Sequence, residues 1–330
     1  MRKLLLGTTA LAAAATLSAN VAIADVSISG YYEWKYQSRG SDVATTDGTS
    51  TGSDSEIHVK FSNKTDSGLT IGMVTEIETD DGDSLINEGS LSIAGGFGKL
   101  VLGGNDGASD NYGIDAEDVV SEEIQATGTD TLALLDTDVE SVDGDSNKIT
   151  YHLPAMGGLT AGVSFTDSGT NSTAGAQDST SFGAQYNMEA AGASITLGGG
   201  TITQEQVSGT VDIESQNIGV KVVTGDITLI AAQATYEATN ADEEANGVGV
   251  KFKVNDSMSI GAYTVKVEDS TGTTDEEYSN TGAEITYSIA SGLTAYVNIS
   301  DYDYKKGSGT GAGTTSDNGT VSKLTIKATF

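Results

Sequence analysis

The chain has 330 residues, with 47 Asp and Glu against 16 Lys and Arg, so its formal net charge is −31 at pH 7. Cysteine is absent, proline occurs once and glycine occurs 42 times. These values exclude a disulfide framework and a cysteine-based zinc site. No nucleic-acid partner is predicted, because a polyanion repels an acidic surface. Abundant glycine with scarce proline indicates a β-protein with many tight turns rather than a disordered chain.

Residues 1–24 have the pattern of an export signal. Two basic residues, Arg2 and Lys3, precede an apolar stretch, and Ala22-Ile23-Ala24 is a small-residue cleavage site. The alternative is a helical membrane anchor, which needs about 20 apolar residues, and this stretch is shorter. The sequence therefore predicts a cleaved signal peptide followed by a mature domain of residues 25–330.

The mature domain repeats a two-residue alternation of apolar and polar side chains, which predicts strands with one apolar and one polar face. The clearest segments are 26–36, 56–62, 69–78, 149–153, 159–165, 182–188, 248–254, 283–289, 293–299 and 324–330. The alternation is weaker in residues 226–237 and 257–268, where the outward-facing set is left unassigned.

Short and long connections also alternate along the chain. The short ones lie near residues 65–68, 154–157, 189–192, 224–225, 255–256 and 290–292. The long polar ones lie near 38–54, 80–86, 103–147, 167–179, 205–212, 238–246, 269–280 and 303–319. This order predicts an antiparallel up-and-down arrangement of about 16 strands of roughly ten residues, a length typical of tilted transmembrane strands.

Two all-β architectures fit these strands. A soluble sandwich or solenoid would bury the apolar faces, whereas a transmembrane barrel would turn them toward lipid and surround a polar lumen. Lys, Glu, His and Gln at mid-strand positions suit a wet lumen, and aromatic residues recur among the apolar positions. These features favour a 16-stranded antiparallel transmembrane β-barrel.

Several segments resemble the Gram-negative general porins, chiefly the alphaproteobacterial and neisserial kinds. Glu88 to Gly103 is similar to the strand pair that leads into the porin constriction loop, and Lys148 to Gly162 is similar to the strands that leave it. Val59 to Glu78 and the terminal Phe330 also match the family. The resemblance implies a homotrimer in the Gram-negative outer membrane, with the loop after the fifth strand folded into each barrel.

In this chain the loop implied by the resemblance is residues 103–147. It contains thirteen acidic residues and no Lys or Arg. The candidate acidic residues of the constriction are Asp106, Asp110, Asp115, Glu117, Asp118, Glu122 and Glu123. A short apolar segment, Leu132 to Leu135, is predicted to fix the loop to the wall. The alternative is a solvated surface loop.

The resemblance also implies basic wall residues that face the acidic loop. The candidates are Lys35, Lys60 and Lys64, with His58 between the first two. Lys99 and Lys148 are weaker candidates. Each lysine has the alternative of a charge at the barrel rim, and Lys64 lies beside a predicted short turn. Because carboxylates outnumber cations, the sequence predicts a negative lumen and weak cation selectivity.

No cofactor is required, but the carboxylates also suggest Ca²⁺, which binds six to eight oxygens. Asp143, Asp145 and Asn147 have the spacing that begins an EF-hand loop, but Lys148 stands where that loop needs glycine. An equal alternative is divalent ions that bridge the external loops to lipopolysaccharide. With two histidines in the whole chain and no catalytic motif around them, no enzyme is predicted.

The predicted function is an outer-membrane porin, a water-filled channel for passive diffusion of ions and small hydrophilic solutes. Its other partners are outer-membrane lipid and lipopolysaccharide. Two alternatives from other classes are a secreted acidic calcium-binding or surface-layer protein, and a barrel anchor with adhesive external loops. The Gly-Gly-x-Gly-x-Asp repeat of calcium β-solenoids is absent from the sequence, which disfavours the first.

Overall fold

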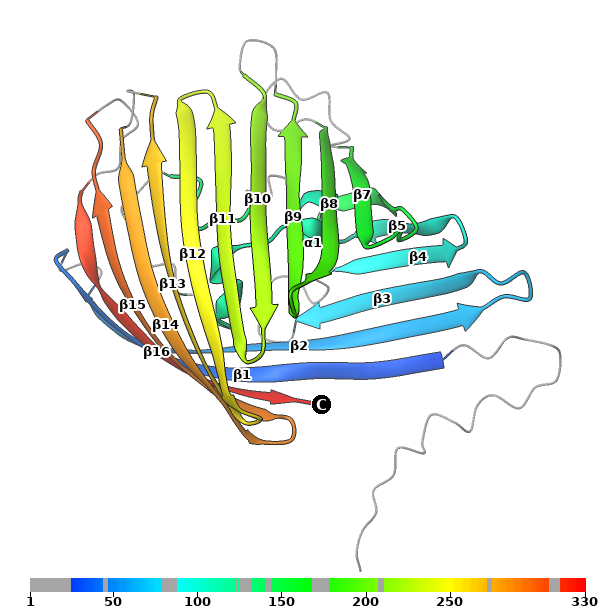
Figure 1. Cartoon of the computed structure of the whole chain (residues 1–330), viewed down its shortest axis with the longest axis horizontal. Helices are drawn as coiled ribbons and strands as arrows, with labels where there is room; N and C mark the ends of the chain where they lie inside the picture. Colours follow the sequence, from blue (N-terminus) through cyan, green and yellow to red (C-terminus); the bar gives the residue numbers. More distant parts are fainter. Residues whose placement is uncertain are drawn as a thin grey trace, which may run out of the picture.

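The computed structural model describes residues 25–43, 47–78, 88–122, 124, 132–139, 144–167, 178–206, 211–271, 275–308 and 315–330. Sixteen strands pair antiparallel in sequence order, and pairing of the first strand with the last closes the barrel (Figure 1). The predicted 16-stranded antiparallel barrel is confirmed. No helix among these residues is both long enough and apolar enough to cross a bilayer.

The strands range from six to seventeen residues. Their bounds are β1 Asp25–Ser41, β2 Gly48–Lys64, β3 Thr70–Glu78, β4 Gly89–Gly95, β5 Gly98–Gly104, β6 Asn147–His152, β7 Leu159–Thr166, β8 Ser179–Ala190, β9 Ala193–Gln204, β10 Ile213–Thr224, β11 Ile227–Ala238, β12 Ala241–Asn255, β13 Met258–Asp269, β14 Glu277–Ala290, β15 Leu293–Lys305 and β16 Asp317–Thr329. Two short helices, α1 (Ala108–Tyr112) and η2 (Ala116–Val119), follow β5.

The outer face of the barrel is apolar. In β12, for example, Val248, Val250 and Phe252 are exposed on the outside, while Gly247 and Gly249 between them are buried on the inside. A closed barrel has no second sheet against which to bury such a face, so the face suits lipid. The soluble sandwich and solenoid alternatives are therefore wrong.

The structure also shows which faces of the two weakly alternating segments point outward. In β11, Leu229 points outward and is 47% exposed, whereas Ile230 points inward and is 3% exposed. In β13, Val265 and Val267 are likewise buried on the inside. Both faces of these strands are apolar because the inner face packs against protein rather than water.

Two predicted connections are wrong. Residues 38–54 belong largely to β1 and β2, which leave only residues 42–47 between them. Residues 238–246 contain a two-residue turn, with β12 beginning at Ala241. The strands there extend past the apolar belt, so both of their faces are polar; on the outside, Gln233 Nε2 donates a hydrogen bond to Glu244 Oε1 at 2.9 Å.

Candidate pore constriction

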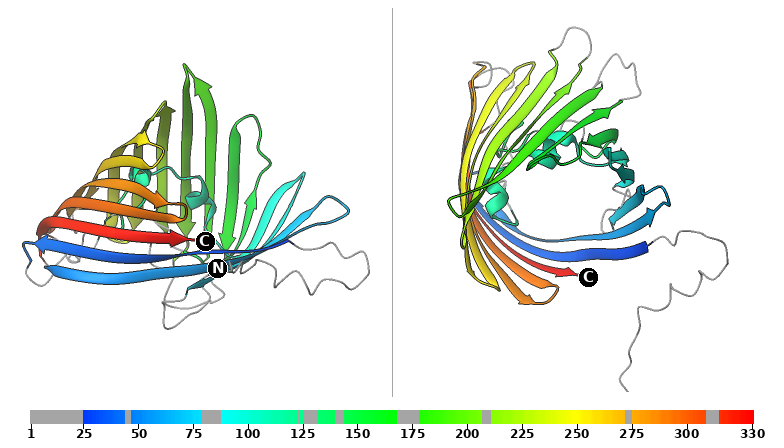
Figure 2. Two further views of the ribbon diagram at one scale, coloured as in Figure 1. Left: turned by 90° about the horizontal axis from the view of Figure 1, so that it is seen from below. Right: turned by 45° about the vertical axis from the view of Figure 1, so that its right-hand side comes forward.

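The described part of residues 103–147 follows the inner face of the barrel wall. Helix α1 contacts β6 to β9, and η2 contacts β11 to β13. Beyond η2, the backbone N–H groups of Ser121 and Glu122 hydrogen-bond Glu284 in β14. Figure 2 shows this segment within the ring of strands. We call it the inner loop.

Glycines of the wall allow the inner loop to approach the strands closely. A Cβ atom on Gly183 would overlap the backbone oxygen of Ala108, and one on Gly219 would overlap that of Ile114. The same is true of Gly249 against Ala116. Because glycine lacks a Cβ, the loop backbone occupies space that side chains would fill at these inward positions.

Two buried wall carboxylates hold the loop backbone. Glu284 accepts hydrogen bonds from the N–H groups of Ser121 and Glu122 at 3.0–3.1 Å. Glu243 in β12 accepts bonds from Ala133 and Leu134 at 2.8–3.0 Å. Each carboxylate is 2% exposed. Charge-assisted bonds of this kind satisfy loop N–H groups that have no strand partner.

Amide and hydroxyl side chains of the wall add further contacts. Asn298 Nδ2 donates to the Glu122 carbonyl and Asn280 Nδ2 to the Ile124 carbonyl, both at 2.7 Å. Near the start of the loop, the Ala108 N–H donates to Ser181 Oγ at 2.9 Å. The inner loop is therefore anchored at several points along its described course.

An apolar cluster fixes the loop as well. Leu132 and Leu134 are buried with Ile114 and Val119 against wall residues that include Tyr263 and Val265. The apolar segment predicted to hold the loop thus packs on the wall. The cluster lies inside the barrel, so part of the interior is a hydrophobic core rather than water.

Carboxylates of the inner loop surround a hollow of about 190 Å³. Its lining contains Asp115, Glu117, Asp118, Asp136 and Asp138, with Val120 and Ser121. Burial and repulsion from neighbouring carboxylates raise the pKa of Asp115 to about 7 and that of Asp138 to about 8. Burial raises the pKa of Glu117 to about 7. These carboxyl groups are therefore partly protonated near neutral pH, and their negative charge increases as the pH rises.

Three acids of the inner loop also hold the loop's own shape or its position. Asp115 Oδ1 accepts a hydrogen bond from Asn217 Nδ2 of β10 at 3.0 Å. Thr137 Oγ1 donates to Glu117 Oε2 at 2.8 Å, which joins η2 to the returning part of the loop. Glu122 contacts Lys323 of β16, with 3.0 Å between the carboxylate and the ammonium.

A row of paired charges crosses the neighbouring wall. Lys327 of β16 lies 2.5 Å from Glu33 of β1, and Glu33 lies 2.8 Å from Lys35. Lys35 also pairs with Asp54 of β2 at 3.0 Å. The predicted basic residue Lys35 is thus neutralised by carboxylates of its own and the adjacent strand. Sequence reasoning missed Lys323 and Lys327, although both alternate with Leu324 and Ile326.

The other predicted basic residues lie on β2. His58 has a carboxylate on each side, Glu56 at 3.2 Å and Glu76 at 3.3 Å. Lys60 shares the inward face of the strand with His58 and is exposed. Lys64 is the last residue of β2, beside the short turn closed by the bond from Thr65 N–H to the Leu69 carbonyl. It therefore lies at the short-turn end of the barrel, away from the inner loop's acids.

The remaining predicted acids and calcium ligands do not gather at one place. Asp106 and Asp145 lie near Glu88, where the three carboxylates come within 4.8 Å of one another. Asp110 lies in α1, Asn147 begins β6, and Glu123 and Asp143 fall outside the described residues. Burial and the nearby Asp145 raise the pKa of Glu88 to about 8. Asp145 therefore lies near Glu88 and Asp106, two carboxylates that were not among the predicted calcium ligands.

The two weaker lysine candidates lie near the ends of the loop. Lys148, 3% exposed, donates a hydrogen bond from Nζ to the Gly144 carbonyl. Lys99 in β5 pairs in register with His152 of β6. Tyr112 Oη of α1 lies 2.8 Å from His152 Nδ1, so this histidine touches the inner loop.

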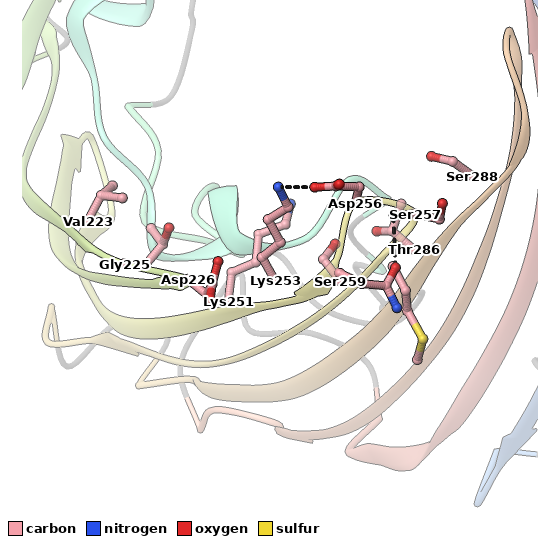
Figure 3. A pocket seen from close by; sticks show the side chains of 13 residues that line it. Val223, Gly225, Asp226, Lys251, Lys253, Asp256, Ser257, Ser259, Thr286 and Ser288 are labelled. Atoms are coloured by element: carbon pink, nitrogen blue, oxygen red, sulfur yellow. Dashed lines mark hydrogen bonds and ion pairs between the residues drawn. The ribbon is translucent and has the colours of Figure 1, made fainter.

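A second hollow, of about 370 Å³, lies on the wall at the short-turn end (Figure 3). It is lined by hydroxyl side chains such as Ser259 and Thr286 and by Lys251 and Lys253. Lys253 pairs with Asp256 at 2.8 Å, and this partner lowers the pKa of the Asp256 carboxyl. Asp226 and Asp256 line the same hollow, so lysines and carboxylates alternate here, whereas the inner loop has no Lys or Arg.

Comparisons with known proteins agree on the family and the fold. The family model described as Gram-negative porin matches residues 7–307. No curated protein matches the sequence. Among solved structures, the anion-selective porin from Comamonas acidovorans is 15% identical and superposes with a TM-score of 0.67, over 93% of this chain and 100% of that one.

Two further solved structures are similar. The trimer form of OmpT, an outer membrane protein of Vibrio cholerae, is 17% identical with a TM-score of 0.67, over 93% of this chain and 99% of that one. A mutant of the Rh. blastica porin is 17% identical with a TM-score of 0.58, over 93% and 100% of the two chains. The family match and the closed 16-stranded barrel together show that this chain belongs to the Gram-negative porin family and is a multi-pass β-barrel of the outer membrane.

Proposed function

We propose that the barrel is a water-filled, weakly cation-selective channel through which ions and small hydrophilic solutes diffuse passively. A barrel of sixteen strands is wide enough to leave an aqueous passage when its interior is only partly filled. The observation that carries the proposal is the acidic hollow on the inner loop. Its carboxylates stand inside the ring of strands, where low-dielectric walls strengthen their field.

Cation selectivity is supported by the balance of charges around the inner loop. The loop has no Lys or Arg, and Lys323 beside it is paired with Glu122. Lys35 and Lys327 are paired with Glu33. Rings of Asp and Glu favour cations. The Comamonas porin is named as anion-selective, so selectivity in this family follows local charge and has to be measured for each chain.

The assembly we propose is a homotrimer, as in the trimer form of the Vibrio protein. Its apolar belt would contact outer-membrane lipid, and its external acidic residues would contact lipopolysaccharide, directly or through divalent ions. Residues 1–24 would act as a cleaved export signal. Ca²⁺ near the loop ends, at Asp145 with Glu88 and Asp106, is a subsidiary proposal that rests on their proximity.

The test is single-channel recording of the purified protein in a planar bilayer, with reversal potentials in a KCl gradient. The proposal expects conductance steps in groups of three and a reversal potential that favours K⁺. A reversal potential that favours Cl⁻ would overturn cation selectivity but retain the channel. Correctly inserted barrels without conductance would overturn the channel and favour the alternative of a barrel anchor with adhesive external loops.

A further inference from the structure

Glu56, His58 and Glu76 form a compact cluster on the inner wall of the barrel. Glu56 and His58 are two residues apart in β2, so both point to the same face. Register pairing places Glu76 of β3 directly opposite His58, and β2 and β3 lie side by side (Figure 1). Ile57 and Val59 take the opposite face, which leaves the cluster on the side of the lumen.

The hydrogen bonding of the cluster is complete only when a proton or a metal ion stands between His58 and the carboxylates. Nε2 of His58 lies 3.2 Å from a Glu56 oxygen, and Nδ1 lies 3.3 Å from a Glu76 oxygen. A neutral imidazole has one N–H, so it can donate to one carboxylate while its other nitrogen presents a lone pair to the second. That arrangement is repulsive unless a proton or a metal ion stands between the two groups.

The ligand atoms are close enough to bind one ion. One atom from each of the three side chains lies within 4.8 Å of the others. The side chains are 13–23% exposed, so the cluster is sheltered by the wall but reachable from the lumen. Three protein ligands would leave further coordination positions for water, as in open metal sites.

The types of ligand indicate which ion would bind. Imidazole suits Zn²⁺, Ni²⁺ and Cu²⁺, whereas Ca²⁺ prefers six to eight oxygens. We propose that Glu56, His58 and Glu76 bind a divalent transition-metal ion on the lumen wall. Binding would change the cluster's charge from about −2 toward zero, so it would weaken the attraction of the nearby lumen for cations.

Zinc binding to the purified trimer, prepared without a histidine tag, tests this site by calorimetry in detergent. Excess Ca²⁺ in the buffer occupies sites made only of carboxylates. We expect one saturable Zn²⁺ site per chain, with affinity at least about tenfold weaker in His58→Gln and Glu76→Gln. The matched control is His152→Gln, which removes the chain's other histidine and should bind Zn²⁺ like the wild type.

Several outcomes would overturn the metal site: no saturable Zn²⁺ binding by the wild type, unchanged binding by His58→Gln, or an equal loss in His152→Gln. Electron paramagnetic resonance of Cu²⁺ bound to the wild type gives a second criterion that needs no variant at His58. The spectrum should contain nitrogen coupling from one imidazole, and a spectrum of oxygen ligands alone would also overturn the site. Binding is measured in detergent, so these results do not depend on whether the barrel conducts ions.

Discussion

The substitution Glu284→Ala removes the wall carboxylate that holds the inner loop just after η2. The wild-type carboxylate accepts hydrogen bonds from the N–H groups of Ser121 and Glu122 and from Asn298 Nδ2. Asn298 keeps its bond to the Glu122 carbonyl, but the two backbone donors lose their acceptor. A bond to a charged group contributes about 1.5–3 kcal/mol, and an unsatisfied buried donor costs about 1–3 kcal/mol.

We therefore expect Glu284→Ala to weaken docking of the loop by about 2.5–4 kcal/mol, the lower part of the summed range of about 2.5–6 kcal/mol, because water can enter the emptied site. The ratio of docked to undocked loop should fall about 60- to 700-fold. Excursions of the loop from the wall should then appear in planar-bilayer recordings as added current noise and substates, while Glu243 continues to hold the returning segment.

Glu33→Ala is the matched control. Glu33 is also a buried carboxylate of the inner wall, 3% exposed, but it pairs with Lys35 and Lys327 rather than with the inner loop. Glu33→Ala removes the same single negative charge from the inner wall. It should therefore change ion selectivity without adding current noise or substates. Anchoring of the loop by Glu284 is refuted if folded Glu284→Ala trimers show the noise and substates of the wild type, or if Glu33→Ala produces the same change.

Three further outcomes are expected. Gly249→Val would place a side chain against the Ala116 backbone, so it should displace the loop or lower trimer stability. The control Gly52→Val, with open space around its Cβ, should do neither. The temperature at which trimers dissociate on gels compares the two variants. The pKa values of Asp115 and Asp138 are raised to about 7 and about 8, so cation selectivity should be full above pH 8 and decline as the pH falls from 8 to 6. Reversal potentials measure this decline, and unchanged selectivity at pH 6 contradicts the role of these carboxylates. The same shifts favour loop docking at low pH, a contribution fully present below about pH 4 and lost as the pH rises to 7–8. Raising KCl from 0.1 to 1 M should reduce selectivity because the screening length falls from about 10 to 3 Å; selectivity that is independent of salt argues against an electrostatic origin.

The sequence predicted the barrel well because lipid imposes a strict two-residue alternation on the outer face. It failed where that constraint ended. Leu229 and Ile230 are both apolar because one faces lipid and the other faces the inner loop. Beyond the apolar belt, Gln233 and Glu244 lie on the outside, so the polar segment near 238–246 resembled a loop although it continues as strand.

The candidate site was predictable in part. The acidic composition of the loop can be counted, but the residues that hold it come from strands more than 160 positions away, as in the bond from Glu122 N–H to Glu284, 162 residues apart. Lys323 and Lys327 carried a readable signal, since each occupies a polar position between apolar residues of the last strand. Their pairing with Glu122 and Glu33 depends on barrel closure, which a local pattern cannot reveal.

The wall glycines against which the inner loop packs, here called the seat of the loop, also constrain the order of folding. Its glycines belong to β8, β10 and β12, all of which follow the loop in the chain. The seat does not exist until those strands have paired, and its contacts span long sequence separations, which form late. Docking of the loop is therefore a final step that follows assembly of the wall. Until then its apolar side chains, Leu132 and Leu134 among them, would remain uncovered, and exposed apolar surface of this kind favours aggregation.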